Sequence, residues 1–396
     1  NMLNTAFEPW PSFTQEEADA VSQVLLSNKV NYWTGQECRE FEKEFAAFAE
    51  TEYAVALANG TVALDAALKA LGISAGDDVI VTSRTFLASA SSIVTAGANP
   101  VFADVELDSQ NISARTIEAV LTPNTKAIIC VHLAGWMCDM DPIMQLAEEK
   151  GIYVIEDCAQ AHGAKYKGKS AGSIGHIGAW SFCQDKIMTT GGEGGMVTTH
   201  DEALWKKIWS YKDHGKNFDS IYNKQHPPGF RWLHDSFGTN WRMMEMQAVI
   251  GRMQLKKMAE WSKVRNENMQ RIYKAFENTP YVTVYQPSEE YTHAAYKCYV
   301  QVNTEQLPEG WSRDRIMNEI SALGVPCFSG SCSEVYLEHA FDNTPWRPAE
   351  RLENAQHMGE TSLMFLVHPT LSNGSLTKTV DAIQTVITRI SNADGV

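Results

Sequence analysis

The chain has 396 residues, 44% of them hydrophobic, and a net charge of −15 at pH 7. It is long enough for a substantial core in one large or two smaller domains, and no run reaches the roughly 18 apolar residues that a membrane span needs. The acidic balance disfavours nucleic acid as a partner, because phosphate contacts require clustered Lys and Arg. Residues 2–10 lack the basic and apolar regions of a secretory signal, so we expect a cytoplasmic protein without a membrane partner.

The eight cysteines are scattered along the chain without a Cys-x-x-Cys pair. Most of them lie in apolar runs, where a free thiol behaves as a small hydrophobic side chain. We therefore expect neither disulfides nor a metal site.

Two segments near the N-terminus match a capping box, in which a side-chain oxygen begins a helix and a carboxylate follows three residues later. They are Thr14-Gln15-Glu16-Glu17 and Thr34-Gly35-Gln36-Glu37. The second predicted helix places Phe41, Phe45 and Phe48 on one face, a stripe that is typical of a core or a subunit interface.

From residue 53 onward, strand-like and helix-like segments alternate. The expected strands are 53–58, 78–82, 100–105, 126–131 and 152–156, and the expected helices are 61–71, 85–96, 113–121 and 139–150. Such alternation is typical of an α/β fold with a mostly parallel sheet flanked by helices. We assign this large domain, together with the N-terminal helices, to residues 1–238.

Residues 239–396 predict a smaller α+β domain. A long helical stretch, 243–277, would connect it to the large domain, and strands 282–285 and 296–302 and helices 312–323 and 376–390 would follow. The loop 227–242 before it mixes aromatic residues with Arg, His, Pro and Gly. Such a loop can bind a polar ligand or a partner subunit, or serve only as a connection.

One lysine stands out. Lys186 lies between a strand-like run that ends at Ser181-Phe182 and the glycine-dense loop 191–195. Most lysines are solvated surface cations, but one that is desolvated on one side can lose its proton and attack a carbonyl.

A carboxylate is expected near this lysine. Residues 151–156 form an apolar run that ends in Asp157, and ligands of open α/β sheets bind at the carboxyl ends of strands. Pyridoxal 5'-phosphate (PLP) needs a lysine for its aldehyde and a carboxylate for its pyridine nitrogen. Asp157 and Lys186 together therefore predict a PLP site.

Two further features fit this cofactor. Asn59-Gly60-Thr61 lies between a strand and a helix, so the amides of Gly60 and Thr61 could bind a phosphate, although such triplets are also common turns. Phe86 follows a strand and could stack on a planar ring, although a single phenylalanine is more often part of the core.

With these motifs in hand, the chain resembles the DegT/DnrJ/EryC1/StrS family of sugar aminotransferases, PLP enzymes with the type I fold. The resemblance extends over almost the whole length. It rests on NGTVALDAAL at 59–68, TSRTF at 82–86, VIEDCAQAHGAKYKGKSAGSIGHIGAWSF at 154–182, the Lys186 loop with GEGG, DHG at 213–215 and GTNWRMMEMQA at 238–248.

The resemblance implies a role for each matching residue. Lys186 would hold PLP as a Schiff base, Asp157 would pair with the pyridine nitrogen and Phe86 would stack on the ring. Gln160 would lie near the phenolic oxygen, and Gly60, Thr61 and Ser181 would hold the phosphate. Asn240 would reach the phosphate in the neighbouring subunit, so the resemblance also implies a homodimer with shared active sites.

The implied reaction moves an amino group from L-glutamate to a keto- or aldehyde-sugar for bacterial surface polysaccharide or lipopolysaccharide. Relatives that act as sugar dehydratases have lost the lysine, so Lys186 favours transamination over dehydration or a non-catalytic regulator. A nucleotide-linked 4-keto-hexose is the usual acceptor. The segment 325–336 departs from the family's usual Tyr-x-Pro-x-His-like pattern, so an oxidised 3-deoxy-octulosonate, giving an 8-amino sugar, is an alternative. Candidate substrate contacts are Arg231, His234, Arg242, Lys297, Ser329 and Ser331.

Overall fold

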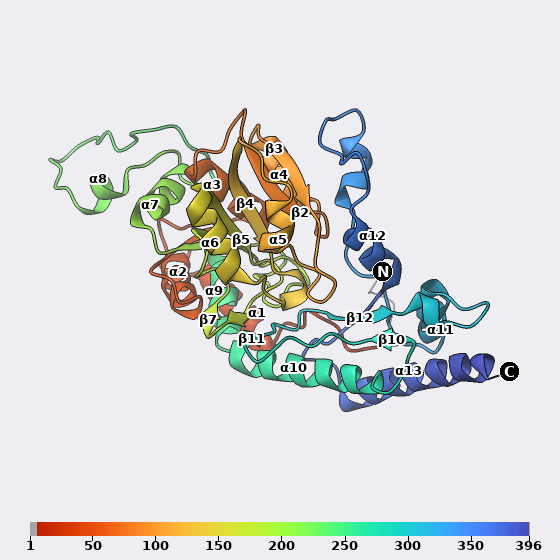
Figure 1. The fold of residues 1–396 in the computed structure, drawn as a ribbon. Coiled ribbons are helices and arrows are strands. Elements are labelled where there is room, and N and C mark those ends of the chain that lie inside the picture. Colours follow the sequence, from red (N-terminus) through yellow and green to blue (C-terminus); the bar gives the residue numbers. More distant parts are fainter. Residues whose placement is uncertain (1–5, 396) are drawn as a thin grey trace.

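A seven-stranded sheet forms the centre of the computed structural model, which describes residues 6–395 (Figure 1). Its strands, in spatial order, are β1 (Tyr53–Leu57), β9 (Gly195–Thr199), β8 (Ile177–Ser181), β5 (Tyr153–Asp157), β4 (Thr125–Val131), β2 (Asp78–Thr82) and β3 (Asn99–Ala103). Strand β9 runs antiparallel to both neighbours, and the pairs from β8 to β3 are parallel. The predicted mostly parallel sheet is confirmed. Residues 2–5, part of the stretch analysed for a secretory signal, lie outside the described residues.

Helices cover both faces of this sheet. They are α3 (Gly60–Ala70), α4 (Ala88–Thr95), α5 (Ala114–Glu118), α6 (Met140–Lys150) and α7 (Glu202–Tyr211). Successive strand residues point to opposite faces. In β4, Ile128 and Cys130 join one buried cluster, and Ala127, Ile129 and Val131 join the other. The sheet therefore separates two apolar cores, as expected for a buried parallel sheet.

The two N-terminal helices differ in how they begin. Helix α1 (Gln15–Leu26) starts with the predicted capping box between Thr14 and Glu17. Helix α2 (Glu37–Phe48) has no such box, so that prediction was wrong. The carboxylate of the distant Glu245 accepts hydrogen bonds from the first backbone N–H groups of α2 instead, at 2.5 Å from that of Glu37. Phe41 is fully buried, and so is Phe45, which confirms the stripe as core.

The predicted continuous helix over 243–277 is wrong. The chain forms α9 (Glu245–Leu255) and α10 (Met258–Ala275), which are separated by two residues. Helix α9 packs against α1 and α2, whereas α10 continues to the C-terminal part of the chain. The two residues between the helices are lysines, and neither Pro nor Gly marks the break. The break coincides with the change from one set of packing partners to another.

A further core lies in the C-terminal part. Here the strands β10 (Val282–Thr283), β12 (Cys298–Val302) and β13 (Ser362–Phe365) form an antiparallel sheet with helices α11 (Arg313–Ala322), α12 (Glu353–Thr361) and α13 (Asn373–Asp394). Helix α13 packs along α10 (Figure 1). Short 3-10 turns occur at Leu133–Gly135, Thr304–Gln306, Val335–Leu337 and His339–Phe341. The cluster of buried residues begins at Met269, while the domain boundary at 238/239 stays a prediction.

A small sheet links the two parts of the chain. It consists of β6 (Lys165–Tyr166) and β7 (Lys169–Ser170) from the large part and β11 (Tyr291–Thr292) from the C-terminal part. Strand β11 pairs antiparallel with β6, so Tyr291 lies opposite Tyr166. This small sheet therefore holds the C-terminal part beside the central sheet.

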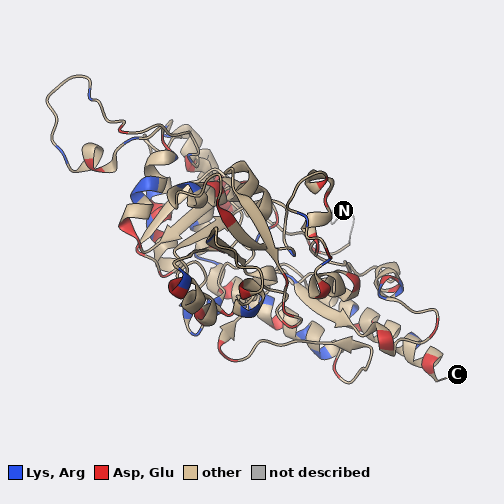
Figure 2. Cartoon of the chain, turned by 45° about the horizontal axis from the view of Figure 1, so that its top comes forward, with Lys and Arg blue, Asp and Glu red and all other residues tan. Residues whose placement is uncertain are grey.

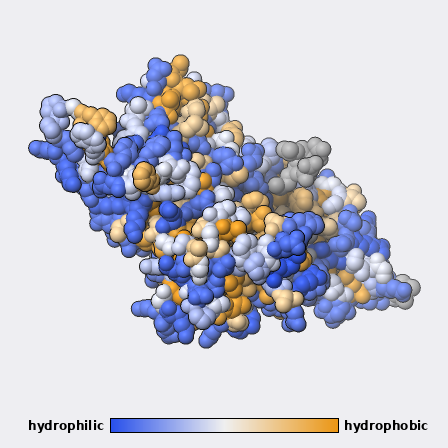
Figure 3. Space-filling model, turned by 90° about the horizontal axis from the view of Figure 1, so that it is seen from above, coloured by the Kyte–Doolittle hydropathy of each residue, from blue (hydrophilic) through white to orange (hydrophobic). Residues whose placement is uncertain are grey.

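Residues 216–238 form an arm that projects from the body and contains α8 (Phe218–Tyr222) (Figure 1). Its base is held by backbone pairing, including the bridge between Lys216 and His234. Phe230, Trp232 and Phe237 on this arm are 82%, 85% and 98% exposed. The face shown in Figure 3 is mostly hydrophilic with separate apolar patches, and acidic and basic residues both occur along the helices (Figure 2). Between residues 6 and 395, the helices are too short or too polar to cross a membrane.

Candidate active site

A cavity of about 620 Å³ opens where β5 and β8 end and α3 begins. Seven of the predicted cofactor contacts line it, namely Gly60, Thr61, Phe86, Asp157, Gln160, Ser181 and Lys186. Further lining residues include Thr85, Ser89, Asp185 and Glu193, which sequence reasoning did not single out. The structure therefore brings together predicted cofactor contacts that are up to 126 positions apart in the chain, from 60 to 186.

Asp157 is the last residue of β5, between β4 and β8, and its side chain is buried. One carboxylate oxygen accepts a hydrogen bond from Ser89 Oγ at 2.8 Å, and the other accepts one from the backbone N–H of Ala159 at 3.2 Å. Thr85 Oγ1 lies 2.8 Å from Ser89 Oγ, so these hydroxyls form a chain that orients the carboxylate. The sequence analysis missed this support, because Thr85 lies before α4 and the spacing of four residues to Ser89 is not by itself a signal.

Lys186 lies in the loop that follows β8. Its backbone N–H donates to Cys183 O at 3.2 Å, and its Nζ lies 5.3 Å from the centre of the Tyr296 ring. An aromatic face attracts a cation and leaves the lysine's N–H groups free for a ligand. The amine is therefore held over one wall of the cavity by a neutral ring.

The first turn of α3 provides an anion site. The side chain of Asn59 caps the helix by accepting from Val62 N–H at 2.9 Å, which leaves the N–H groups of Gly60 and Thr61 without intrahelical partners. A Cβ at Gly60 would lie 2.5 Å from Ser181 Cβ. Only glycine lets this turn approach β8 so closely, and the resulting amides and hydroxyls suit a phosphate.

Two other predicted contacts occupy the sides of the cavity. Phe86 is 73% exposed and precedes α4, which begins at Ala88 and not at the predicted residue 85. The backbone N–H of Thr85, before this helix, donates to Cys332 O. Gln160 Oε1 accepts from the backbone N–H of Ala134 at 2.7 Å, so its amide nitrogen stays available.

Asn240 and Arg242 lie outside this cavity. Asn240 is exposed, and its Oδ1 accepts from the backbone N–H of Arg242 at 3.3 Å. Arg242 pairs with the buried Asp213 at 2.9 Å, and Lys216 pairs with the same carboxylate at 2.7 Å. Asp213, in the DHG motif, therefore orders the base of the arm next to β1.

The remaining predicted substrate contacts do not meet in the cavity. Arg231 and His234 are exposed on the arm. Ser331 packs on Tyr299, whose hydroxyl accepts from the Ser331 backbone N–H at 2.9 Å, and Ser329 O accepts from Ser362 Oγ at 2.7 Å. Lys297 lies over the Tyr296 ring at 4.8 Å, where burial lowers the pKa of its amine to about 8. Tertiary packing, which the sequence pattern does not report, separates these residues.

Two histidines behind the cavity are structural. Burial, and then the charge of Lys186, lowers the pKa of His162 to about 3, so its neutral ring donates from Nε2 to Ser181 O at 2.9 Å. His132 accepts from Cys138 N–H at Nδ1, and its Nε2 therefore donates to Glu156 at 2.8 Å. Each ring fixes the end of a strand that carries a cavity residue.

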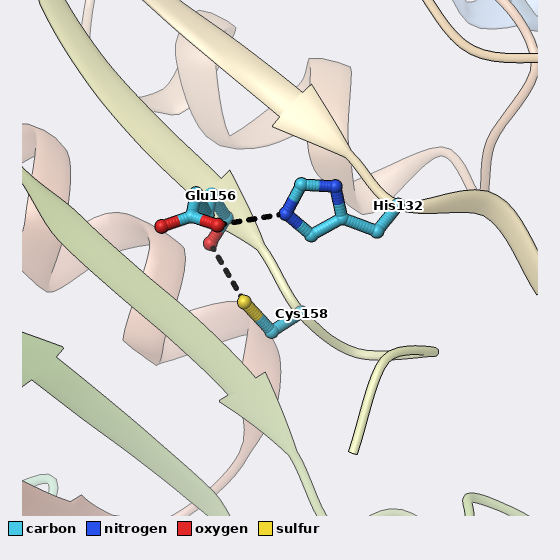
Figure 4. A group of neighbouring side chains, drawn as sticks. All are labelled: His132, Glu156 and Cys158. Carbon is cyan, nitrogen blue, oxygen red and sulfur yellow. Dashed lines mark hydrogen bonds and ion pairs between the residues drawn. The ribbon is translucent and has the colours of Figure 1, made fainter. Parts of the chain in front are cut away.

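His132, Glu156 and Cys158 lie close enough to suggest a metal site (Figure 4). The carboxylate of Glu156 is already occupied by His132 and by the backbone N–H groups of Gly172, Ile174 and Gly175. Burial alone would raise its pKa, but these hydrogen bonds lower it overall. Burial raises the pKa of the Cys158 thiol, which points at a backbone carbonyl. All three side chains therefore already have hydrogen-bond partners in the core, and we interpret the cluster as structural and not as a metal site.

Comparison with known proteins identifies the class. The model of the DegT/DnrJ/EryC1/StrS aminotransferase family matches residues 11–384. A GDP-perosamine synthase from Escherichia coli O157:H7 is 39% identical over 303 residues, 76% of this chain and 78% of that protein. A dTDP-3-amino-3,4,6-trideoxy-alpha-D-glucose transaminase from Streptomyces venezuelae is 30% identical over 99% of this chain and 96% of its own.

A solved structure agrees with this result. The X-ray structure of the aminotransferase from Psychrobacter cryohalolentis matches with 64% sequence identity and a TM-score of 0.96, covering 98% of this chain and 100% of that one. The chain therefore belongs to the DegT/DnrJ/EryC1/StrS aminotransferase family. It is a PLP-dependent sugar aminotransferase with the type I fold, and the cavity has the lysine, carboxylate and anion site that this cofactor requires.

Proposed function

We propose that the protein transfers the amino group of L-glutamate to the ketone of a nucleotide-linked 4-keto-hexose, for bacterial surface polysaccharide such as lipopolysaccharide. The observation that carries this proposal is the position of Lys186 and Asp157 on one cavity with the first turn of α3. The two named relatives support a sugar-nucleotide acceptor. The sugars in their names are linked to different nucleotides, GDP and dTDP, so we do not assign the nucleotide of the acceptor.

When bound, PLP acts as an electron sink for the carbon that loses or gains a proton. The proposed role of Asp157 is to keep the ring nitrogen protonated, with Ser89 and Ala159 holding the carboxylate in place. The Nζ of Lys186 would accept the proton from the amino donor and return it during the second half of the reaction. Ping-pong kinetics follow, because 2-oxoglutarate would leave the cavity before the sugar binds there.

The other lining residues would position the cofactor. Gly60, Thr61 and Ser181 would donate hydrogen bonds to its phosphate, Phe86 would cover the ring and Gln160 would donate its free amide N–H to the ring oxygen. The buried, neutral His162 donates to Ser181 O and so holds the end of β8 in place. These assignments use the polar groups that packing leaves available in the cavity.

The proposed working unit is a homodimer with shared sites. Asn240 lies outside the cavity of its own chain and is exposed, and the arm that precedes it carries three almost fully exposed aromatic rings. A second copy of the chain would bury these rings and bring Asn240, Arg231 and His234 to its own cavity. A cytoplasmic location is proposed because all eight cysteines are free thiols, six of them buried.

Turnover separates this function from its alternatives. Purified holoenzyme should convert L-glutamate to 2-oxoglutarate with a panel of keto- and aldehyde-sugars, and Lys186→Ala should abolish this. If only an oxidised 3-deoxy-octulosonate is aminated, the function is instead the synthesis of an 8-amino sugar. Loss of water from the sugar without amino transfer would indicate a dehydratase. A protein that binds PLP and turns over none of these would be a regulator.

A further inference from the structure

Arg84 is a fully buried cation without an anionic partner. It lies directly before Thr85 and Phe86, which line the cavity. Its Nη2 donates to Ser362 Oγ at 3.0 Å, but Nε and Nη1 have no hydrogen-bond partner among the described residues. Since Nε carries one N–H and Nη1 carries two, about three of the five guanidinium donors are unpaired.

The surroundings of Arg84 compensate its charge only in part. The guanidinium stands 5.3 Å from the centre of the Tyr299 ring, and Tyr299 and Cys332 favour the charged form, whereas Arg313, a second cation, opposes it. Burial lowers the pKa of Arg84, as expected for a desolvated cation. Arg313 itself is satisfied, because its Nη1 donates to Gly359 O and Ser362 O at 2.9 and 3.0 Å. A buried charge with so few partners destabilises the fold.

A short segment lies beside Arg84, residues 329–332, which we call the covering segment; the backbone N–H of Thr85 donates to its Cys332 O at 3.2 Å. Ser362 Oγ links it to the guanidinium, because it accepts from Arg84 and donates to Ser329 O. Gly330 has a φ of 90° and packs so tightly on Tyr299 that a Cβ there would clash with the ring. The covering segment itself is half-buried to exposed.

Arg84 is connected to the cavity on two sides. On one side, its neighbour Thr85 belongs to the hydroxyl chain that ends at Asp157. On the other side, Tyr299 packs against Ala134, whose N–H binds Gln160 in the cavity wall. A group that displaced the covering segment would therefore reach Arg84 from the substrate side.

We propose that Arg84 binds a carboxylate of the substrate, which enters between Tyr299 and the covering segment. This assignment deepens the proposed function and rests on it, since that reaction brings carboxylates to the cavity. The carboxylate has two possible sources, the amino donor and an acidic acceptor sugar. A guanidinium and a carboxylate form short, charge-assisted hydrogen bonds, which would use the N–H groups that are unpaired in the unliganded chain.

Binding of unreactive carboxylates to the holoenzyme tests this without turnover. The probes are glutarate for the donor, 3-deoxy-octulosonate and its uncharged methyl ester for an acidic sugar, and inorganic phosphate as a non-carboxylate anion. We expect at least one carboxylate to raise the melting temperature of the wild type, and Arg84→Met to weaken its binding roughly tenfold to hundredfold. A response to glutarate alone assigns the site to the donor, and a response to the octulosonate but not its ester assigns it to the acceptor.

Two controls make the result decisive. Without ligand, Arg84→Met should melt at the same or a higher temperature than the wild type, because it removes an unpaired buried charge. Arg313→Met removes the neighbouring cation and should keep carboxylate binding. Arg84 would be a structural residue if Arg84→Met melted several degrees lower and still bound carboxylates, and a response to phosphate alone would also overturn the assignment. Loss of turnover with sugars would leave these binding results unchanged, so the two proposals fail separately.

Discussion

The indole N–H of Trp10 donates a hydrogen bond of 2.9 Å to the backbone carbonyl of Lys186, 176 positions away. The guanidinium of Arg265 lies 5.0 Å from the same indole ring, and Trp261 packs edge-on against it at 5.0 Å. The segment before Trp10 is fixed as well, because His368 binds Glu8 O and Thr370 binds Pro9 O. The N-terminal segment, residues 8–10, thus connects the loop that carries Lys186 to the C-terminal part.

Trp10→Phe keeps an aromatic ring but removes this N–H. We expect kcat to fall about twofold to tenfold, the value of one hydrogen bond, with a shift in the absorbance of the bound cofactor. Trp261→Phe is the matched control, since Trp261 touches the same cluster and forms no hydrogen bond to Lys186. Equal loss in both variants would mean that ring packing alone is responsible.

The Ser89 hydroxyl supports Asp157, so Ser89→Ala should lower kcat/KM. A hydrogen bond to a charged group predicts a loss of about tenfold or more, measured by steady-state kinetics. Ser92 is equally buried on α4, but its hydroxyl bonds only to the backbone carbonyl of Ser89. Ser92→Ala should therefore stay near the wild type, and an equal effect of the two changes would remove Ser89 from the support of Asp157.

Gly60→Ala should weaken cofactor binding. The added Cβ would lie 2.5 Å from Ser181 Cβ and would push the first turn of α3 away from β8. Overpacking of this kind costs about 1–3 kcal/mol, or roughly fivefold to hundredfold in the dissociation constant of PLP, measured by fluorescence titration. Gly374→Ala is the matched control and should leave PLP affinity unchanged. Gly374 lies in the first turn of α13, where an added Cβ would meet Ser372 Oγ at 3.7 Å, an ordinary contact. Unchanged PLP affinity in Gly60→Ala would contradict the phosphate role of this turn.

Mixing two impaired variants tests the shared site. Lys186→Ala removes the proposed proton carrier, and Asn240→Asp places a carboxylate where the neighbour's phosphate is proposed to lie, while keeping an oxygen for Arg242 N–H. Random exchange of subunits should restore about one quarter of wild-type activity, because half of the dimers are mixed and each has one intact site. Activity that stays at the sum of the separate variants would show that each subunit works alone.

Acid should destabilise the fold through buried histidines. Burial lowers the pKa of His162 to about 3 and those of His293 and His368 to about 4. The unfolded chain therefore binds protons below pH 6.5 that the folded chain does not, and stability falls as pH falls from about 6.5 toward 4. The slope is about 1 kcal/mol per histidine and pH unit. Glu42 partly offsets this loss of stability. Burial raises its pKa to about 7, so on acidification the folded chain binds a proton at Glu42 before the unfolded chain does.

Urea unfolding of the holoenzyme at pH 7.5 and 5.5 measures this effect. His293→Gln keeps an acceptor for the N–H of Ala295 and removes one proton site, so it should lose less stability between the two pH values than the wild type. An identical loss in the variant would show that His293 does not contribute.

Sequence periodicity predicted the buried strands of the central sheet best. The strands around Asp157 were placed within a few residues, because an apolar run that ends in a carboxylate has few alternative structures. The false capping box at Thr34 and the break after Leu255 depend on Glu245 and on packing with α1, and neither is local. The same reason explains why Arg231, His234, Ser329 and Ser331 were grouped by chemistry and are separated in space. Trp10 could not be foreseen, since its partner is 176 positions away.

Strand β5 ends in two acids that face opposite ways, Glu156 into a backbone turn at Gly172–Gly175 and Asp157 into the cavity. Mutational libraries meant to broaden the range of accepted sugars can therefore treat the two sides of this strand as separate design problems. Changes around Asp157 act on the cavity, while changes at Glu156 act on the hydrogen bonds that hold His132 and the turn at Gly172–Gly175 in the core.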